Sequence, residues 1–240
     1  MSLFARYREA ARPTQDIDLA ASGLPNTEDA VANILQAVCV LPFGDGLTFD
    51  PSLVRTSVIN EAFDYPGVTG RVRAALGPSQ VDLLLDVSFG NVITPGPVTL
   101  TFPPLLLDEA VRIVVYPLET IVTEKFAALV EIGAATTRMK DLYDLHAILT
   151  RESFDAALLR EALHRSFAAR GTPQEAVTDI LSETFAQNSN LDTRFRQYLR
   201  RTGLSAPSWQ AVMTIIGAFY GPVLLDDLRG GTWDGVAWRP

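Results

Sequence analysis

The sequence contains one cysteine, two lysines and two histidines among 240 residues, and no apolar run long enough to cross a bilayer. The single cysteine, Cys39, excludes an intramolecular disulfide and a cysteine-based metal site. Residues 1–6 lack the apolar core of a signal peptide. A net charge of −8 argues against a protein coated in nucleic acid, although it leaves room for a local basic patch. We therefore expect a cytoplasmic protein.

The first half of the chain has the pattern of a sheet-rich protein. Residues 16–21 form a short candidate strand, and residues 26–39 have the apolar stripe of a helix that Thr27 can cap. Stretches rich in β-branched residues, separated by turn residues, predict antiparallel strands at 53–63, 68–76 and 81–89. Two more short strands are predicted at 98–102 and 111–115.

The second half of the chain is predicted to be helical. Pro117 suits the first turn of a helix, and the predicted helices cover roughly residues 117–132, 138–149, 154–170, 173–187, 191–202 and 207–228. The remaining tail contains two tryptophans and is expected to dock on the core. We therefore expect an α+β protein with domains at residues 1–116 and 117–240.

Asp16 and Asp18 lie on one face of the first predicted strand. Because side chains alternate along a strand, Ile17 points to the other face. Two like charges at this spacing repel each other, and a cation between them would remove that cost. Magnesium prefers carboxylate oxygens and leaves room for substrate phosphates. The alternative is a solvated turn before a helix.

Asp86 lies within the apolar strand predicted at 81–89, where an unpaired charge is costly. A metal shared with the two aspartates of the first strand would remove that cost. Three aspartates on strands are typical of two-metal phosphoryl-transfer sites. Asp82, on the same face, is a weaker candidate for the third ligand. The alternative is a salt bridge from Asp86 to an arginine of the preceding strand, Arg71 or Arg73.

Both lysines of the chain fall within one short segment. Lys125 lies in the helix predicted at 117–132, and Lys140 lies in the next helix, four residues before Asp144. Arg138, Asp141 and Asp144 share one face of that second helix. Periodicity alone favours a solvated face with ion pairs worth ~0.2–0.5 kcal/mol each.

A further helix, at 191–202, interleaves aromatic and basic residues. Phe195 and Tyr198 alternate with four arginines, Arg194, Arg196, Arg200 and Arg201. This pattern could hold an RNA backbone and stack a base. A solvated helix face with a buried aromatic edge is the interpretation that we favour.

Four blocks of sequence carry a family resemblance. They are Arg12-x-Thr14-x-Asp16-Ile17-Asp18-Leu19, Asp86-Val87-x-Phe89-Gly90, Tyr116-x-Leu118-Glu119-x-x-x-x-Glu124-Lys125 and Arg138-x-Lys140-Asp141-Leu142-Tyr143-Asp144-Leu145. In this order, spanning residues 12–149, they resemble the AbiEii-type abortive-infection nucleotidyltransferases. These are toxins of type IV-like toxin–antitoxin systems within the DNA polymerase β-like superfamily. The last block is the most specific.

The resemblance implies a nucleotidyltransferase-like mixed β-sheet with flanking helices, followed by a C-terminal helical domain. It implies an NTP, Mg²⁺ and transfer of NMP to a hydroxyl acceptor such as a tRNA 3′ end, with a cognate antitoxin protein as a partner. By match, the metal ligands would be Asp16, Asp18 and Asp86. The nucleotide contacts would be Thr14, Lys125, Arg138 and Lys140. Lys125 would neutralise phosphates and Asp141 would support or activate the acceptor, with Asp144 and Lys140 supporting them.

One departure from the family concerns the phosphate-binding turn. The family has a Gly-Gly or Gly-Ser turn roughly twenty residues before the paired aspartates, whose amides cradle phosphates. The fifteen residues before Asp16 contain no glycine. We therefore expect residues 1–240 to turn over NTP poorly. The alternative function is that of a non-catalytic relative that binds nucleotide, RNA or a partner protein.

Overall fold

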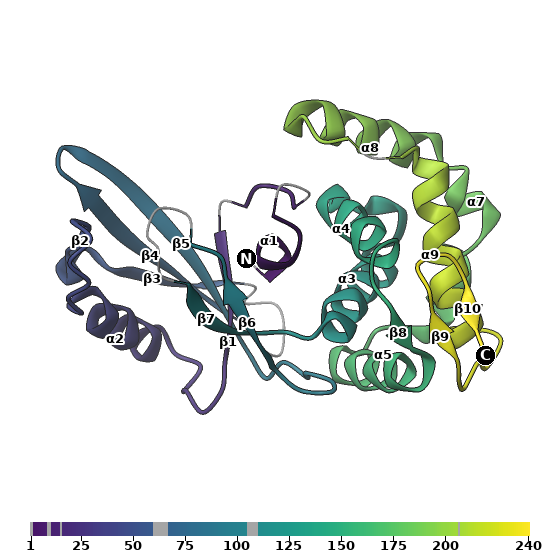
Figure 1. Ribbon diagram of the computed structural model, residues 1–240, viewed down its shortest axis with the longest axis horizontal. Helices are drawn as coiled ribbons and strands as arrows, with labels where there is room; N and C mark the ends of the chain where they lie inside the picture. The colour runs from purple at the N-terminus through teal and green to yellow at the C-terminus, as the bar shows by residue number, and fades with distance from the viewer. Residues whose placement is uncertain (1, 9–10, 15, 60–66, 105–109, 206) are drawn as a thin grey trace. The chain divides into compact units, whose positions relative to one another are not determined.

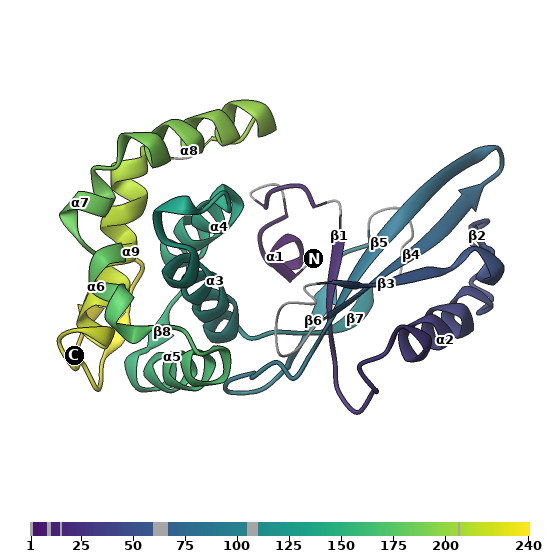
Figure 2. The ribbon, with the colours of Figure 1, turned by 180° about the vertical axis from the view of Figure 1, so that it is seen from behind.

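A computed structural model of the chain describes residues 2–8, 11–14, 16–59, 67–104, 110–205 and 207–240. By its internal contacts the chain forms two compact units, a first unit of residues 13–91 and a second unit of residues 2–12 and 92–240 (Figures 1 and 2). The domain boundary expected at residue 116 stays a prediction. Among the described helices, none has the length and apolar content needed to cross a membrane.

The first unit is a five-stranded mixed sheet with one helix against it (Figure 1). Its elements are β1 (Asp16–Ala21), α2 (Glu28–Cys39), β2 (Thr48–Phe49), the 3-10 helix η2 (Pro51–Leu53), β3 (Arg55–Ile59), β4 (Gly67–Leu76) and β5 (Ser79–Phe89). The order across the sheet is β1-β5-β4-β2, and β3 also pairs with β4. β1 runs parallel to β5, whereas β4 is antiparallel to each of its neighbours.

Alternation along β4 and β5 explains which face of this sheet α2 covers. Alternate residues of β4 and Val87 of β5 are buried on this face, and they form a core with the apolar stripe of α2 and with Val54: Val31, Leu35, Cys39, Val54, Val68, Val72 and Val87. The hydroxyl of Thr27 caps α2 by accepting a hydrogen bond from the amide of Ala30, as the sequence predicts. The intervening residues of β4 and β5 lie on the opposite face.

The second unit is mostly helical. Its elements are α1 (Ser2–Tyr7), the hairpin β6 (Val98–Phe102) and β7 (Val111–Val115), α3 (Leu118–Ile132), η3 (Gly133–Ala135), α4 (Met139–Leu149), β8 (Phe154–Asp155), α5 (Ala156–Arg170), η4 (Gln174–Ala176), α6 (Val177–Ile180), α7 (Glu183–Ala186), α8 (Ser189–Thr202), α9 (Trp209–Leu224), β9 (Thr232–Trp233) and β10 (Trp238–Arg239). The largest fully buried side chains come from α3, α4, β8, α5, α8, α9 and the C-terminal tail.

The C-terminal tail completes this core, as expected. β9 pairs with β10 and with β8, so the tail forms a small sheet with a segment much earlier in the chain. Trp233 is fully buried, stacks edge-on against Phe219, and donates a hydrogen bond from its indole nitrogen to the carbonyl of Leu149 at 2.7 Å. The tail is therefore part of the folded unit.

The structure confirms the α+β class with a mixed sheet and flanking helices, and corrects two predicted helices. The helix predicted at 154–170 begins only at Ala156, because Phe154 and Asp155 form β8 and the carboxylate of Asp155 caps α5. The helix predicted at 173–187 is three short helices, since Ser182 interrupts the run and caps α7. Residues 60–63 of the strand predicted at 53–63 lie outside the described residues.

Gly231 is a position of the tail where glycine is required. Its φ is +111°, and a Cβ atom there would overlap the carbonyl oxygen of Arg239. We expect Gly231→Ala to lower the free energy of unfolding of the second unit by about 1–3 kcal/mol, because the strained backbone and the overlap coincide. Urea unfolding followed by tryptophan fluorescence measures this, since all three tryptophans lie in the second unit.

The control for this prediction is the neighbouring Gly230→Ala. No atom lies within 4 Å of the position of its Cβ, so we expect a change of less than about 0.5 kcal/mol. Equal losses in the two variants would contradict the constraint assigned to Gly231.

Candidate active site

The three strand aspartates meet on the face of the first unit's sheet opposite α2. Asp18 is the register partner of Asp86 in the parallel pairing of β1 with β5. Asp16 lies two residues before Asp18 and points to the same face. One carboxylate oxygen from each of the three lies within 4.8 Å of the others. The structure thus brings together the residues that the sequence predicts as metal ligands.

Neighbouring hydroxyl groups orient two of these carboxylates. Thr69 Oγ1, on the strand next to Asp86, donates a hydrogen bond to Asp86 Oδ1 at 2.6 Å. Thr14 Oγ1 lies 2.8 Å from Asp16 Oδ1 and 3.0 Å from the carbonyl oxygen of Asp16, in range to donate to either. Asp18 is exposed and has no hydrogen bond or ion pair with any described residue.

The salt-bridge alternative for Asp86 is not observed. Arg73 Nε instead donates to Asp82 at 2.7 Å, and Arg71 Nη1 lies 3.7 Å from the same carboxylate. The hydrogen bond from Arg73 lowers the pKa of Asp82. Asp82 is therefore already paired and is a poorer metal ligand than Asp86, which forms no ion pair among the described residues.

This donor set fits a divalent cation. Three carboxylates within a few ångströms repel one another, and their attraction to a bound divalent cation would outweigh that repulsion. Oxygen-only ligands are the preference of magnesium. Among the described residues, no other group of three acidic, histidine or cysteine side chains has this proximity.

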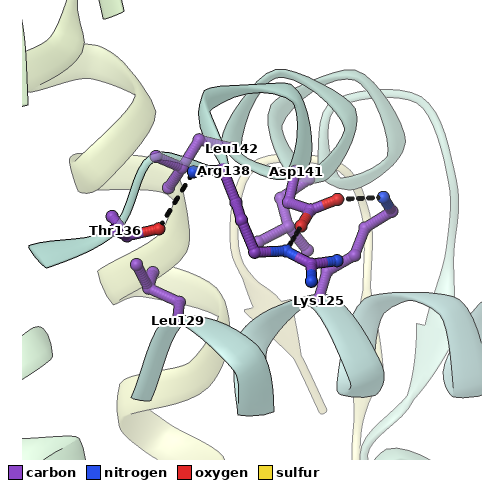
Figure 3. Close-up of a pocket in the computed structure, with 7 residues that line it drawn as sticks. Lys125, Leu129, Thr136, Arg138, Asp141 and Leu142 are labelled. Carbon is purple, nitrogen blue, oxygen red and sulfur yellow. Dashed lines mark hydrogen bonds and ion pairs between the residues drawn. The ribbon is translucent and has the colours of Figure 1, made fainter. Parts of the chain in front are cut away.

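A second charged cluster lies in the second unit, around Lys125 (Figure 3). Lys125 Nζ donates to Asp141 Oδ1 at 2.6 Å and to Asp144 Oδ2 at 2.8 Å. Arg138 Nε donates to Asp141 at 2.5 Å, and Arg12 Nε lies 3.1 Å from both carboxylate oxygens of Asp144. Three cations and two anions leave one positive charge in the cluster, which we call the Lys125 cluster.

The solvated face that periodicity favours for α4 is wrong. Asp141 and Asp144 are only 4% and 2% exposed. Their cationic partners come from α3 and from residue 12 as well as from α4, so the ion pairs are mostly long-range. Lys140, four residues before Asp144, forms no ion pair with any described residue. Its predicted role in nucleotide binding stays a prediction.

The charges around Asp141 decide its protonation. Burial alone would raise the pKa of its carboxyl, but the charges of Lys125 and Arg138 and their hydrogen bonds outweigh that effect, and the pKa lies below its ordinary value. For Arg12, burial acts to lower the pKa, but the charge of the adjacent Asp144 carboxylate and its hydrogen bond outweigh burial, and the pKa lies above its ordinary value. Asp141 and Arg12 therefore remain ionised at neutral pH.

Glu124, next to Lys125 in the third block, points to a different helix. It accepts hydrogen bonds from Ser166 Oγ at 2.5 Å and from Arg170 Nη1 at 2.7 Å, both on α5. The adjacent Glu-Lys pair thus links α3 to two neighbouring helices. Its acidic member has a structural role, while Lys125 belongs to the charged cluster.

Sequence reasoning assigned no role to Thr69 or to Arg12. The strands predicted at 68–76 and 81–89 leave a turn at 77–80 and would pair residue 69 with residue 88. The turn of the structure is shorter, at residues 77–78, and it pairs Thr69 with Asp86. Arg12 stands in the first block of the family pattern, but no local spacing connects it to Asp144, 132 residues later.

A model of the family described as "Nucleotidyl transferase AbiEii toxin, Type IV TA system" matches residues 1–215. The chain is also similar to the crystal structures of JHP933 from Helicobacter pylori and of a protein from the same organism described as a proposed nucleotidyltransferase. Each is 14% identical with a TM-score of 0.47, over 94% of this chain and 82% and 84% of those chains. No curated protein matches.

The ionised Asp141 predicts a pH dependence of stability. Its pKa is lowered in the folded state, so its contribution is complete above the unfolded value of about 3.9 and is lost as the pH falls through the folded value. We expect Asp141→Asn to cost about 3 kcal/mol at pH 7, because it leaves buried cations short of a partner. The cost should shrink towards pH 2. Urea midpoints followed by tryptophan fluorescence at several pH values measure it.

Asp226→Asn is the control, because Asp226 is exposed and forms no ion pair with a described residue. It should leave the pH profile of the unfolding free energy unchanged. A cost of Asp141→Asn that is the same at pH 7 and at pH 2 would contradict the assignment.

Proposed function

Because this chain belongs to the AbiEii family of nucleotidyl transferase toxins of type IV toxin–antitoxin systems, we propose that it transfers NMP from an NTP to a hydroxyl group in a metal-dependent reaction. The acceptor is RNA, such as the 3′ end of a tRNA. The observation that carries this proposal is the cluster of three aspartates, Asp16, Asp18 and Asp86. The site of action is the cytoplasm, and a cognate antitoxin is the regulatory partner.

The three aspartates are assigned to Mg²⁺. The side chain of Asp18 has no competing partner in the described part of the chain, and Thr69 holds the Asp86 carboxylate in one orientation. When bound, the ion would neutralise charge on the phosphoryl oxygens during an in-line displacement. The role of the protein is then to fix the carboxylates on two rigid neighbouring strands.

Lys125 is assigned to the NTP phosphates. An ammonium group has three N–H donors, and Asp141 and Asp144 accept two of them, which leaves one for a phosphate oxygen. The half-exposed side chain of Arg138 can supply further positive charge to a ligand. Thr14 and Lys140 are the remaining nucleotide contacts of the proposal.

Asp141 is proposed to support the acceptor indirectly. Its lowered pKa makes it a weak base, so it is poorly suited to remove a proton from a hydroxyl group. Its contacts suit it to hold Lys125 and Arg138 in their binding positions.

The test compares two aspartates of β5. Asp86→Asn removes a proposed metal ligand, whereas Asp82→Asn removes an equal charge from the same face of the same strand. We expect transfer of label from α-labelled NTPs to total RNA, with Mg²⁺ present, to fall by about 100-fold or more in Asp86→Asn and by less than about twofold in Asp82→Asn. Equal effects would contradict the metal role of Asp86.

A binding readout accompanies the activity, because the sequence predicts weak turnover. With Mg²⁺, each of ATP, GTP, CTP and UTP is tested for a rise in the melting temperature of the chain, which should disappear in Asp86→Asn. Binding of an NTP without any transfer by the unmodified chain would favour the alternative of a non-catalytic relative.

A further inference from the structure

One flank of α8 carries two arginines and a tyrosine in a row. Leu191 and Phe195 are fully buried and define the inner face of the helix. Arg194, Tyr198 and Arg201 follow the spacing i, i+4, i+7, so their side chains lie along a single line beside that face. We call this line the α8 flank.

The α8 flank is continuous with the Lys125 cluster. α8 packs on α4 within the second unit (Figures 1 and 2). Arg194 Nη1 donates to the carbonyl of Thr136 at 3.1 Å, just before α4. Tyr198 is half-buried and packs against the core of the second unit. Burial raises the pKa of its hydroxyl, and the charges of Arg12 and Asp144 of the cluster act on it in opposite directions.

The other arginines of the helix lie elsewhere. Arg196 is exposed and pairs with Asp192 at 2.8 Å, one turn earlier. Arg200 is exposed and forms no hydrogen bond or ion pair with a described residue. Arg200 and Arg201 are adjacent, so their side chains point about 100° apart. Of these two arginines, only Arg201 belongs to the α8 flank.

The chemistry of the flank suits a single-stranded nucleic acid. The whole chain has a net charge of −8 and therefore repels a polyanion. α8, in contrast, carries four arginines and one aspartate, and this local excess of positive charge attracts a polyanion. Guanidinium groups bind phosphates and an aromatic ring stacks on a base. None of the exposed large hydrophobic side chains of the described residues lies on α8, so the apolar anchors typical of a protein interface are missing.

We propose that the α8 flank binds the single-stranded end of the RNA that accepts the nucleotide. Arg194 and Arg201 contact its phosphates, and the ring of Tyr198 stacks on one base. This inference rests on the proposed function for the identity of the RNA as the acceptor. It adds the surface that binds this RNA.

The test compares Arg201→Glu with Arg200→Glu. The two substitutions change the charge equally in the last turn of one helix, so their effects on the helix dipole match. Binding of a fluorescein-labelled ten-nucleotide single-stranded RNA is measured by anisotropy without NTP or metal. We expect Arg201→Glu to weaken binding by about tenfold and Arg200→Glu by less than about twofold. Arg201→Gln should reduce the slope of log affinity against log salt by about 0.7.

Tyr198 supplies an independent readout. Tyr198→Phe keeps the ring and should retain binding within about twofold, whereas Tyr198→Leu should weaken it by about fivefold or more through lost stacking. Melting temperatures of all variants establish that the second unit is folded. Equal weakening by Arg200→Glu and Arg201→Glu, or by the two tyrosine variants, overturns the proposal.

A competitor separates RNA from an acidic protein partner. A ten-residue polyglutamate should displace the labelled RNA only at a concentration far above that of unlabelled RNA. Equal displacement overturns the proposal in favour of a protein surface. RNA binding that depends on Arg201, without nucleotide transfer, would leave this inference standing and refute the proposed function. Metal-dependent transfer, together with RNA binding that Arg201→Glu does not weaken, would refute this inference and leave the proposed function standing.

Discussion

The parallel pairing of β1 with β5 is the constraint on which the candidate metal site depends. Asp18 faces Asp86 only in this register, and a slip of one residue would turn the aspartates of β1 towards α2. The core beneath α2 prevents that slip, because Ala21 of β1 packs against it together with Leu85 and Phe89 of β5. The apolar face of the sheet therefore positions the acidic face, and neither could be changed without the other.

The second unit adds a buried cluster of charges to its apolar core. Burying Asp141 and Asp144 would be costly if either lacked a partner, and Lys125 serves both. Arg12 and Arg138 complete the pairing, so one cluster joins α3, α4 and the segment after α1. The Lys125 cluster thus holds helices together and is also the part of the second unit that we assign to phosphate binding. The most specific block of the family resemblance, residues 138–145, supplies three members of this cluster.

Local sequence patterns predicted most of the fold, but they could not identify interaction partners that lie far apart in the sequence. Strict alternation placed Asp16, Asp18 and Asp86 on the correct strands, and β6 and β7 have their predicted bounds. Periodicity misjudged Asp141 and Asp144 because their partners come from other elements. The apolar pattern at 173–187 continues through Ser182, so it did not reveal the interruption there. The Ser182 hydroxyl caps α7 and begins a new helix at that point. The predicted strand bounds miss the pairing of Thr69 with Asp86 by two residues, and nothing local identifies Arg12.

The pairing of β8 with β9 has a consequence for synthesis of the chain. β8 and α5 leave the ribosome long before Trp233, yet the indole of Trp233 fills the space beside Phe219 and satisfies the carbonyl of Leu149. Until residue 233 has emerged, the nascent helical unit lacks the largest fully buried side chain of its core. A chain that terminates before Trp233 lacks this segment and exposes apolar surface to chaperones and proteases. The helical unit is therefore fully assembled only when synthesis of the polypeptide is complete.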